Sequence, residues 1–345
     1  MANIKELAKA CNVSAATVSN VLNGKPGASK DTRDLVMKKA KEMDYTPNYV
    51  AKNLKMKNTR SIGVIAEDMT IFSIPDIIDG ITEFCEQENY QILLTNLRLY
   101  KKFQSTYYDK EDYYELAVKE MKELIAKQVD GIIYVAAHER VIRCIPENLP
   151  IPAVMAYGFT GSRKVPSVVV DDATGTYDAI RHLIENGHKN IGVIAGKHSS
   201  IHVQERLKGY QRALRDSGIL YDPDLVCGWS WDDKMGYRYA QDLIEKGVTA
   251  IFCMNDMLAA EVCDRLRELE VKIPEEISVV GYDDREISRY LRPALTTVRL
   301  PLYEIGYNAA KVMLELLDGE ENVGREARVE AVASQLVLRD SVGKR

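Results

Sequence analysis

The sequence predicts a small helical head followed by a much larger, two-lobed α/β body. Residues 1–60 place apolar side chains at helical spacing and carry 12 Lys and Arg against 5 Asp and Glu, a net charge of +7. From residue 61 onward, short apolar strands alternate with longer helical patterns, and 34 basic side chains face 46 acidic ones. A basic head on an acidic body indicates a polyanionic partner for the head alone, and a solvated basic helix surface is the alternative.

The composition excludes several classes of protein. With 345 residues, 46% hydrophobic and 28% charged, the chain suits a soluble globular protein of two or three compact units. No apolar run approaches the roughly 18 residues of a membrane span, and the start MANIKELAKACNVS lacks the apolar core of a secretion signal, so we expect a cytoplasmic protein. Its cysteines never form a CxxC pair, which argues against a disulfide framework or a thiolate zinc site. They are Cys11, Cys85, Cys144, Cys227, Cys253 and Cys263.

The first 45 residues predict three helices. Asn12 stands in a turn after the first helix, where it can take the left-handed conformation, and Ser14 can cap the second helix. The expected buried positions are Ile4, Leu7, Ala8 and Cys11 on the first helix, Val18, Val21 and Leu22 on the second, and Leu35, Val36, Lys39, Ala40 and Met43 on the third. The remaining side chains of the second helix are small or polar: Ala15, Ala16, Thr17, Ser19, Asn20 and Asn23.

This small polar face suits the major groove of DNA. A helix that enters a groove about 12 Å wide needs slim residues near its N-terminus, hydroxyls for phosphates and an amide or guanidinium for base edges. The head therefore predicts a helix-turn-helix DNA-binding domain. A helical hairpin that serves packing alone is the alternative.

The body predicts two parallel sheets, each covered by helices. The expected strands are SIGVIA, YQILLTN, GIIYVAA, PAVMAY, SVVV, NIGVIAG, LVCGW, AIFCMN and SVVGYD, too many for one compact sheet. Two lobes are the natural solution, with a ligand between them at the carboxyl ends of the strands.

Rival chemistries fail on spacing. The two glycines of GVIAGKHS are one residue too close for a phosphate-binding loop, and His198 stands where Ser or Thr must reach magnesium. His198 and His202 are four apart but lack the HExxH pattern of a zinc site. The acidic pairs Asp171–Asp172 and Asp283–Asp284 have no matched nucleophile. We therefore expect no enzyme activity, no cofactor and no metal.

Many short segments resemble the lactose-repressor (LacI/GalR) family in family order. They are VSAATVSNVLNG, TRDLVMKKAKEMDYTPNYVAKNLK, SIGVI, DGIIYV, ENGHKNIGVIAG, ERLKGY, NDMLA, SVVGYDD and PALTTVRLP. The resemblance implies a helix-turn-helix domain at 1–47, a hinge helix and linker at 48–60, and a periplasmic-binding-protein-like body at 61–345. It further implies an N-lobe at 61–158 and 288–319 and a C-lobe at 159–287 and 320–345, with crossovers near Gly158, Ser288 and Gly319.

The resemblance also implies the contacts with DNA. Base-reading positions fall on Ala15, Ala16 and Asn20, and positions near phosphates fall on Ser14, Thr17, Ser19, Asn23, Thr32, Tyr45 and Asn48. The family commonly has Arg where this chain has Asn20. The segment NYVAKNLK is shorter than the roughly 12–15 residues that a lone helix needs in water. In the family two such segments pair across a dimer and insert a leucine into the minor groove, which implies Leu54 as the wedge and Ala51 as the site of close approach. An ordinary linker is the alternative.

Five positions of the body match the family's effector contacts: Glu67, Arg206, Trp231, Asn255 and Asp283. An uncharged polyol needs an aromatic face and a few convergent donors and acceptors, which these residue types supply. Each also has a structural interpretation: an Arg206–Asp283 ion pair, a core role for Trp231 and a helix cap for Asn255. Glu67 is the weakest match, because DMTIFS stands where the family usually has Asn-Pro-Phe-Phe.

The segment 98–115 is longer than the family's usual connection and holds six aromatic residues: Tyr100, Phe103, Tyr107, Tyr108, Tyr113 and Tyr114. A surface loop leading into a helix is the simplest interpretation. A lid over the ligand or an added dimer contact is the alternative, because tyrosine pairs an apolar ring with a polar tip.

Together, these features predict a homodimeric transcription repressor that binds a near-palindromic operator and whose operator affinity is controlled by a sugar bound between its lobes. The rivals are a plain sugar-binding receptor and a sugar-processing enzyme without a DNA role.

Overall fold

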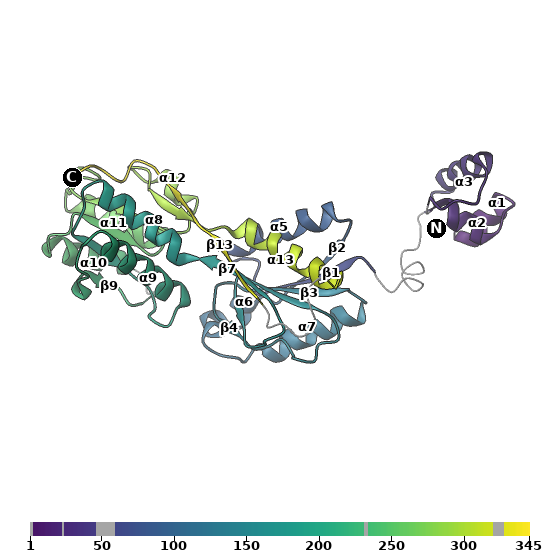
Figure 1. The fold of residues 1–345 in the computed structure, drawn as a ribbon, viewed down its shortest axis with the longest axis horizontal. Helices are drawn as coiled ribbons and strands as arrows, with labels where there is room; N and C mark the ends of the chain where they lie inside the picture. Colours follow the sequence, from purple (N-terminus) through teal and green to yellow (C-terminus); the bar gives the residue numbers. More distant parts are fainter. Residues whose placement is uncertain (1–2, 23, 46–58, 231–233, 320–327) are drawn as a thin grey trace. The chain divides into compact units, whose positions relative to one another are not determined.

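The structure is a computed structural model that describes residues 3–22, 24–45, 59–230, 234–319 and 328–345. The chain divides into two compact units, Met1–Thr59 and Arg60–Arg345 (Figure 1). The predicted hinge, with Asn48, Ala51 and Leu54, lies outside the described residues, as do Asn23 and Trp231.

The first unit is the predicted three-helix head. Its helices are α1 (Ile4–Ala10), α2 (Ala15–Leu22) and α3 (Lys30–Glu42). Asn12 between α1 and α2 has φ 52°, the left-handed conformation expected of this turn. The head's small core holds Leu7, Ala8, Cys11, Val18, Val21, Val36 and Ala40. Two expected core residues are wrong: Leu35 is 42% exposed, and Lys39 pairs with Glu42 at the surface, since α3 turns Val36 and Ala40 inward instead.

The first lobe of the body contains a six-stranded sheet in the order β13-β7-β5-β3-β1-β2, whose pairings are all parallel. The strands are β1 (Ser61–Ala66), β2 (Gln91–Asn96), β3 (Gly131–Val135), β5 (Ala153–Ala156), β7 (Ser167–Asp171) and β13 (Val329–Ala333). Helices α5 (Ser73–Gln87) and α13 (Leu302–Leu317) pack on one face, and α7 (Tyr114–Ala126) packs on the other. A short pair, β4 (Val141–Ile142) and β6 (Phe159–Thr160), lies beside it.

Two glycines allow α5 and α13 to touch through their backbones. A Cβ at Gly80 would lie 2.0 Å from the Tyr303 carbonyl oxygen, and one at Gly306 would lie 1.9 Å from that of Ile77. Any larger residue at either position would force the two helices apart.

The second lobe contains a four-stranded parallel sheet in the order β11-β10-β8-β9. The strands are β8 (Ile191–Ile194), β9 (Val226–Cys227), β10 (Ala250–Cys253) and β11 (Ser278–Val280). Helices α8 (Asp172–Glu185) and α9 (Ile201–Asp216) pack on one face, and α10 (Met235–Glu245) and α11 (Asp256–Glu268) pack on the other. Smaller elements are η2 (Pro223–Leu225), α12 (Ile287–Tyr290) and the antiparallel pair β12 (Thr297–Arg299) and β14 (Gln335–Val337).

The three crossovers lie about 12 to 15 residues beyond the expected positions near Gly158, Ser288 and Gly319. Strand β7 pairs with β5 and β13 in the first sheet, so the chain leaves the first lobe after Asp171. It returns between β12 and α13, and leaves again between β13 and β14. The expected lobe boundaries were wrong because the run SVVV was assigned to the second lobe, although its hydrogen-bond partners belong to the first.

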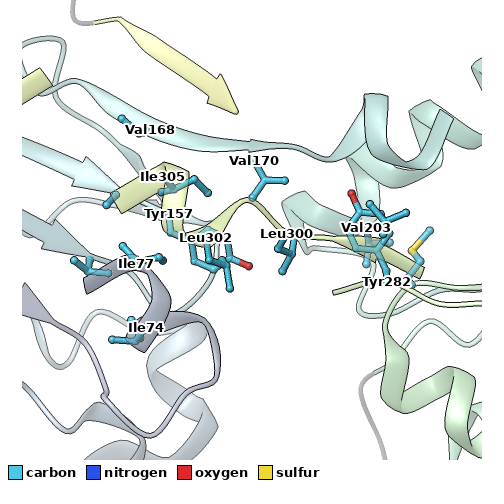
Figure 2. Packing of buried hydrophobic residues seen from close by; sticks show 14 of the residues in the cluster. Ile74, Ile77, Tyr157, Val168, Val170, Val203, Tyr282, Leu300, Leu302 and Ile305 are labelled. Atoms are coloured by element: carbon cyan, nitrogen blue, oxygen red, sulfur yellow. The ribbon is translucent and has the colours of Figure 1, made fainter. Parts of the chain in front are cut away.

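The apolar core is continuous through these crossovers. Figure 2 shows Val170 and Leu300 on the connecting strands, with Tyr157 and Leu302 on the side of the first lobe and Tyr282 on the side of the second. All five belong to one cluster of buried side chains. The crossovers are therefore packed connections rather than solvated linkers.

Within the described residues, no helix is long and apolar enough to cross a membrane. All six cysteines are free thiols; five are buried and Cys227 is half-buried.

Candidate functional site

Helix α2 of the head is capped as its sequence predicts. Ser14 Oγ accepts a hydrogen bond from the Thr17 backbone N–H at 3.0 Å and lies 2.8 Å from the Thr17 hydroxyl oxygen. Val18 and Val21 point into the head core. Because these positions fix the rotation of α2 about its axis, its small polar face is turned to solvent.

The predicted DNA contacts that the structure describes are all accessible. Ser14, Ala16 and Asn20 are exposed, and Ala15, Thr17, Ser19, Thr32 and Tyr45 are half-buried. Thr32 lies in the first turn of α3, where its backbone N–H donates to Ser29 Oγ at 3.2 Å. Asn20 lies in the last turn of α2, before the C-cap position, and its side chain is exposed.

In the body, Arg206 and Asp283 come together as expected. Arg206 Nε donates to Asp172 Oδ1 at 2.8 Å, and its guanidinium lies 3.7 Å from Asp283 Oδ1. The guanidinium also lies over the Tyr282 ring, 3.6 Å from its centroid, and donates to the Met254 carbonyl oxygen. Arg206 is 4% exposed, so this charge is nearly desolvated and depends on its partners.

Three more polar residues complete this group, and the sequence did not single them out as ligand contacts. Asp172 Oδ2 lies 2.5 Å from His202 Nδ1, and the Glu139 backbone N–H donates to His202 Nε2 at 3.2 Å. Glu139 Oε1 accepts from the Val170 backbone N–H at 2.5 Å. We call Glu139, Asp172, His202, Arg206 and Asp283 the interlobe junction, because Glu139 follows strand β3 of the first lobe and the others belong to the second. The available signal for Glu139 was its place two residues after the apolar run GIIYVAA.

The carboxyl groups of the interlobe junction have unusual pKa values. Burial raises the pKa of Glu139 to about 7 and that of Asp283 to about 6. Burial also opposes the charge on Asp172, but Arg206 and His202 outweigh it and lower the pKa of that carboxyl. Burial opposes the charge on His202, but Asp172 outweighs burial and raises the pKa of the ring, whose Nδ1 faces Asp172 while Nε2 faces the Glu139 backbone N–H.

These residues do not form a ready metal site. Glu139, Asp172 and His202 offer ligand atoms within 4.8 Å of one another. However, Asp172 and His202 already bind each other, and Arg206 holds the second oxygen of Asp172. A cation here would be repelled by the positive charge of the Arg206 guanidinium, so the internal hydrogen bonds are favoured over metal binding.

The backbone at Asp283 is unusual for a residue other than glycine. Its φ is 104°, in the region that costs an L-amino acid on the order of 1–3 kcal/mol. The Asp283 backbone N–H donates to the Val298 carbonyl oxygen at 2.8 Å, and the neighbouring Asp284 pairs with Arg299 and Arg339. The contacts of these neighbours hold the Asp283 carboxyl toward Arg206.

Glu67 takes a structural role in place of the expected effector contact. It is fully buried in the first lobe, where Oε1 accepts from Tyr134 at 2.9 Å and Arg140 at 2.7 Å. Oε2 accepts from the Ala137 N–H at 2.9 Å and from Arg140 at 3.0 Å. With four hydrogen bonds, the carboxylate has no lone pair left for an effector.

Asn255 takes the position of a helix cap. Its Oδ1 accepts from the Leu258 backbone N–H at 2.7 Å, at the start of α11 and directly after β10. The capping bond occupies the amide oxygen, so an effector contact from Asn255 would have to use its NH2 group.

The aromatic segment 98–115 lies mostly on the surface and leads into helix α7, as the simplest interpretation predicted, but two of its rings anchor it in the first lobe. It folds into α6 (Leu99–Phe103) and the 3-10 helix η1 (Gln104–Tyr108). Tyr107 and Tyr113 are each 1% exposed, and Arg140 donates to the Tyr113 hydroxyl at 2.7 Å.

Two further contacts join the lobes. Lys197 Nζ lies 2.6 Å from both carboxylate oxygens of Asp109, and the Arg285 guanidinium lies over the Phe72 ring, 4.6 Å from its centroid. Together with the Glu139–His202 hydrogen bond, they hold the lobes in contact across their facing edges.

Two surface hollows of about 300 Å³ each are found elsewhere, on the first lobe. One lies between α7 and residues 146–150, and the other is lined by residues 159–167 and Val329.

Comparison with known proteins gives the family. Residues 3–48 match the family described as bacterial regulatory proteins, lacI family, and residues 180–342 match the periplasmic binding protein-like domain. The HTH-type transcriptional repressor PurR of Vibrio campbellii is 31% identical over 348 residues, which cover 100% of this chain and 99% of that protein. The chain belongs to the LacI family of transcriptional regulators.

Other LacI-family proteins match over the same length. PurR of Aliivibrio fischeri is 28% identical, covering 100% of this chain and 99% of its own. The lac repressor dimer bound to operator and the anti-inducer ONPF matches with a TM-score of 0.76 at 24% identity, covering 99% of each chain, which shows the shared fold. The transcriptional regulator CelR in complex with cellobiose matches with a TM-score of 0.63 at 25% identity, covering 99% of this chain and 100% of that one.

These relationships confirm the coarse function and the fold. This LacI-family protein is a ligand-responsive, DNA-binding transcriptional repressor, built as a helix-turn-helix head and a periplasmic-binding-protein-like body. Its relatives are repressors rather than enzymes.

Proposed function

We propose that this protein is a homodimeric, cytoplasmic repressor whose affinity for a near-palindromic operator is controlled by a sugar or sugar derivative bound at the interlobe junction. The observation that carries the proposal is the meeting of Arg206, Asp172 and Asp283 with Glu139 of the opposite lobe. Buried polar groups that span two lobes can bind a small molecule and register the arrangement of the lobes at the same time.

A sugar suits the junction because acceptor oxygens outnumber donor groups there. Three carboxyl groups face one guanidinium and one imidazole. The hydroxyl groups of a polyol can donate to the carboxylates and accept from Arg206, whereas an anionic ligand would meet repulsion. CelR, a regulator of similar fold, was solved with cellobiose, which supports a sugar by analogy.

For DNA, we assign base reading to Ala15, Ala16 and Asn20, and phosphate contacts to Ser14, Thr17, Ser19, Asn23, Thr32, Tyr45 and Asn48. Paired hinge segments of the two protomers then insert Leu54 into the minor groove, with Ala51 at the point of closest approach. An effector that binds one lobe arrangement more tightly than the other shifts the protein toward that arrangement and so changes its affinity for the operator. Operator binding must then change the affinity for the effector by the same factor.

The test has two steps. Selection from a random duplex pool with the full-length protein is expected to yield a near-palindromic site that it binds in a salt-dependent way. Repeating the binding with ribose, cellobiose and other sugars, and with purine bases, is expected to change the affinity for that site only with a sugar. An effect of purine bases alone would replace the sugar in this proposal, and the lack of any selected site would overturn the operator model.

A further inference from the structure

The aromatic segment 98–115 lies at the ligand-facing edge of the first sheet. It follows β2 directly, and Asp68, just beyond β1, accepts a hydrogen bond from the Tyr100 backbone N–H at 2.9 Å. The carboxyl ends of parallel strands form the edge where α/β proteins bind ligands. Tyr107 and Tyr113, buried beneath this edge, fix the segment in place.

One tyrosine of the segment contacts two other rings. The Tyr108 ring centroid lies 4.2 Å from that of Tyr107 and 4.1 Å from that of His138. His138 immediately precedes Glu139, whose backbone N–H bonds His202 across the interlobe junction. Tyr108, which is half-buried, therefore stands beside the junction on the side of the first lobe.

A polar atom without a partner lies beside the same ring. Among the described residues, His138 Nδ1 is a buried side-chain nitrogen with no hydrogen-bond partner, whereas the buried Tyr107 hydroxyl interacts with the hydroxyl of Tyr108. The unpaired nitrogen belongs to the ring that packs against Tyr108. Burying a polar group without a hydrogen bond costs about 1–3 kcal/mol, so such atoms call for a ligand or water.

The segment also reaches the second lobe. Asp109, the residue after Tyr108, pairs with Lys197, which follows β8 at the carboxyl edge of the second sheet. This pair bridges the two lobes beside the junction.

Building on the proposed function, we infer that residues 98–115 form a cap over the interlobe junction, where Tyr108 and His138 bind the effector and the Asp109–Lys197 bridge closes the cap. The C–H face of a sugar ring packs on Tyr108, and one hydroxyl group of the sugar satisfies His138 Nδ1. The cap thereby selects the effector, independently of Arg206 and Asp283.

Calorimetry with the full-length protein tests the contact, with ribose and cellobiose as probes and hypoxanthine as a planar base for comparison. Tyr108→Ala is expected to weaken the sugar that binds the wild type by about three- to tenfold, since it removes the aromatic face. Tyr108→Phe, which keeps that face, and Tyr100→Ala, which alters a tyrosine of the same segment that is 46% exposed, are expected to stay within twofold of the wild type.

Unchanged sugar affinity in Tyr108→Ala would overturn the cap's role while leaving the proposed function intact. Binding of hypoxanthine alone would instead refute the sugar, and the same three variants would then show whether the cap contacts the base.

Hydrogen exchange tests the closing bridge without any ligand. Lys197→Met is expected to speed exchange of the amides in residues 98–109 by about two- to fivefold, the range of an exposed ion pair. The charge swap Asp109→Lys with Lys197→Asp is expected to restore protection, and Lys189→Met, an exposed lysine of the same lobe, serves as the control. Equal exchange in Lys197→Met and wild type would overturn the bridge and the cap with it.

Discussion

Replacing Asp283 by Asn is expected to stabilise the repressor while weakening its response to the effector. In the folded body burial raises the pKa of Asp283 from 3.8 to about 6, so the carboxyl holds its proton more tightly than it does in the unfolded chain. Each unit by which folding shifts a pKa corresponds to about 1.4 kcal/mol in the free energy of unfolding. Ionised Asp283 therefore costs the folded state on the order of 3 kcal/mol at neutral pH.

The sign of this effect sets its pH dependence. A carboxyl whose pKa is raised on folding destabilises the native state increasingly as pH rises from about 4 to 6, and by a constant amount above that. Asn cannot ionise, so Asp283→Asn is expected to gain up to about 3 kcal/mol in the free energy of unfolding at pH 7.5 and almost nothing at pH 4.

Urea unfolding of the full-length protein at the two pH values measures the difference, with Asp216→Asn on the exposed end of α9 as the control. Because Arg206 keeps Asp172 at 2.8 Å, its charge stays paired in the variant. The effector's influence on operator binding is expected to be lost, since the sugar proposed above would no longer find the Asp283 carboxylate as an acceptor. An Asn variant less stable than wild type at pH 7.5 would show that the Arg206–Asp283 pair contributes more than burial costs, and would refute the reasoning.

Three further predictions concern the partner carboxylate, the hinge and the recognition helix. Asp172→Ala, which leaves the Arg206 charge buried without its closest partner, is expected to cost about 3–5 kcal/mol in urea unfolding, and a loss below 1 kcal/mol would contradict the buried-pair assignment. Leu54→Ser is expected to weaken specific operator binding far more than non-specific binding in duplex titrations, because phosphate contacts survive; equal losses would count against the wedge. Asn20→Arg is expected to shift one position of each half-site from A·T to G·C by about 1–3 kcal/mol in operator selection, whereas a phosphate-contacting Asn20 would leave the selected bases unchanged.

The sequence predicted those parts of the structure that depend on local pattern. The cap at Ser14, the left-handed turn at Asn12 and the order of strands and helices all follow from residues that are neighbours in the chain. The crossovers did not, because the run SVVV has the same composition in either lobe. Only its pairing with β5 and β13, far away in the sequence, assigns β7 to the first sheet.

The candidate site divides in the same way. Arg206 and Asp283 stand in motifs shared with the family, and the structure brings them together. Glu139 lies in no such motif, and its partner His202 is 63 residues away, so only the folded chain reveals their contact. For Glu67 the opposite holds. Its sequence position matched an effector contact of the family, but in the folded chain Arg140 and Tyr134 donate hydrogen bonds to its carboxylate.

The charge balance of the interlobe junction connects these observations to the response. Burial raises the pKa of Glu139 to about 7, so at neutral pH this carboxyl is partly protonated and its ionisation is opposed by the nearby Asp172. A ligand that donates hydrogen bonds to Glu139 favours the ionised form and lowers that pKa, so binding releases a proton. Effector affinity is therefore expected to rise with pH between about 6 and 8, and the dependence is expected to vanish in Glu139→Gln. Because burial at the junction and Asp172 of the second lobe raise this pKa, ionisation of Glu139 by itself disfavours the lobe arrangement in which these groups meet, and the hydrogen bonds that the ligand donates offset this cost. Calorimetry in buffers of different ionisation enthalpy measures the released proton directly, and binding with no proton exchange at pH 7 would place the effector away from Glu139.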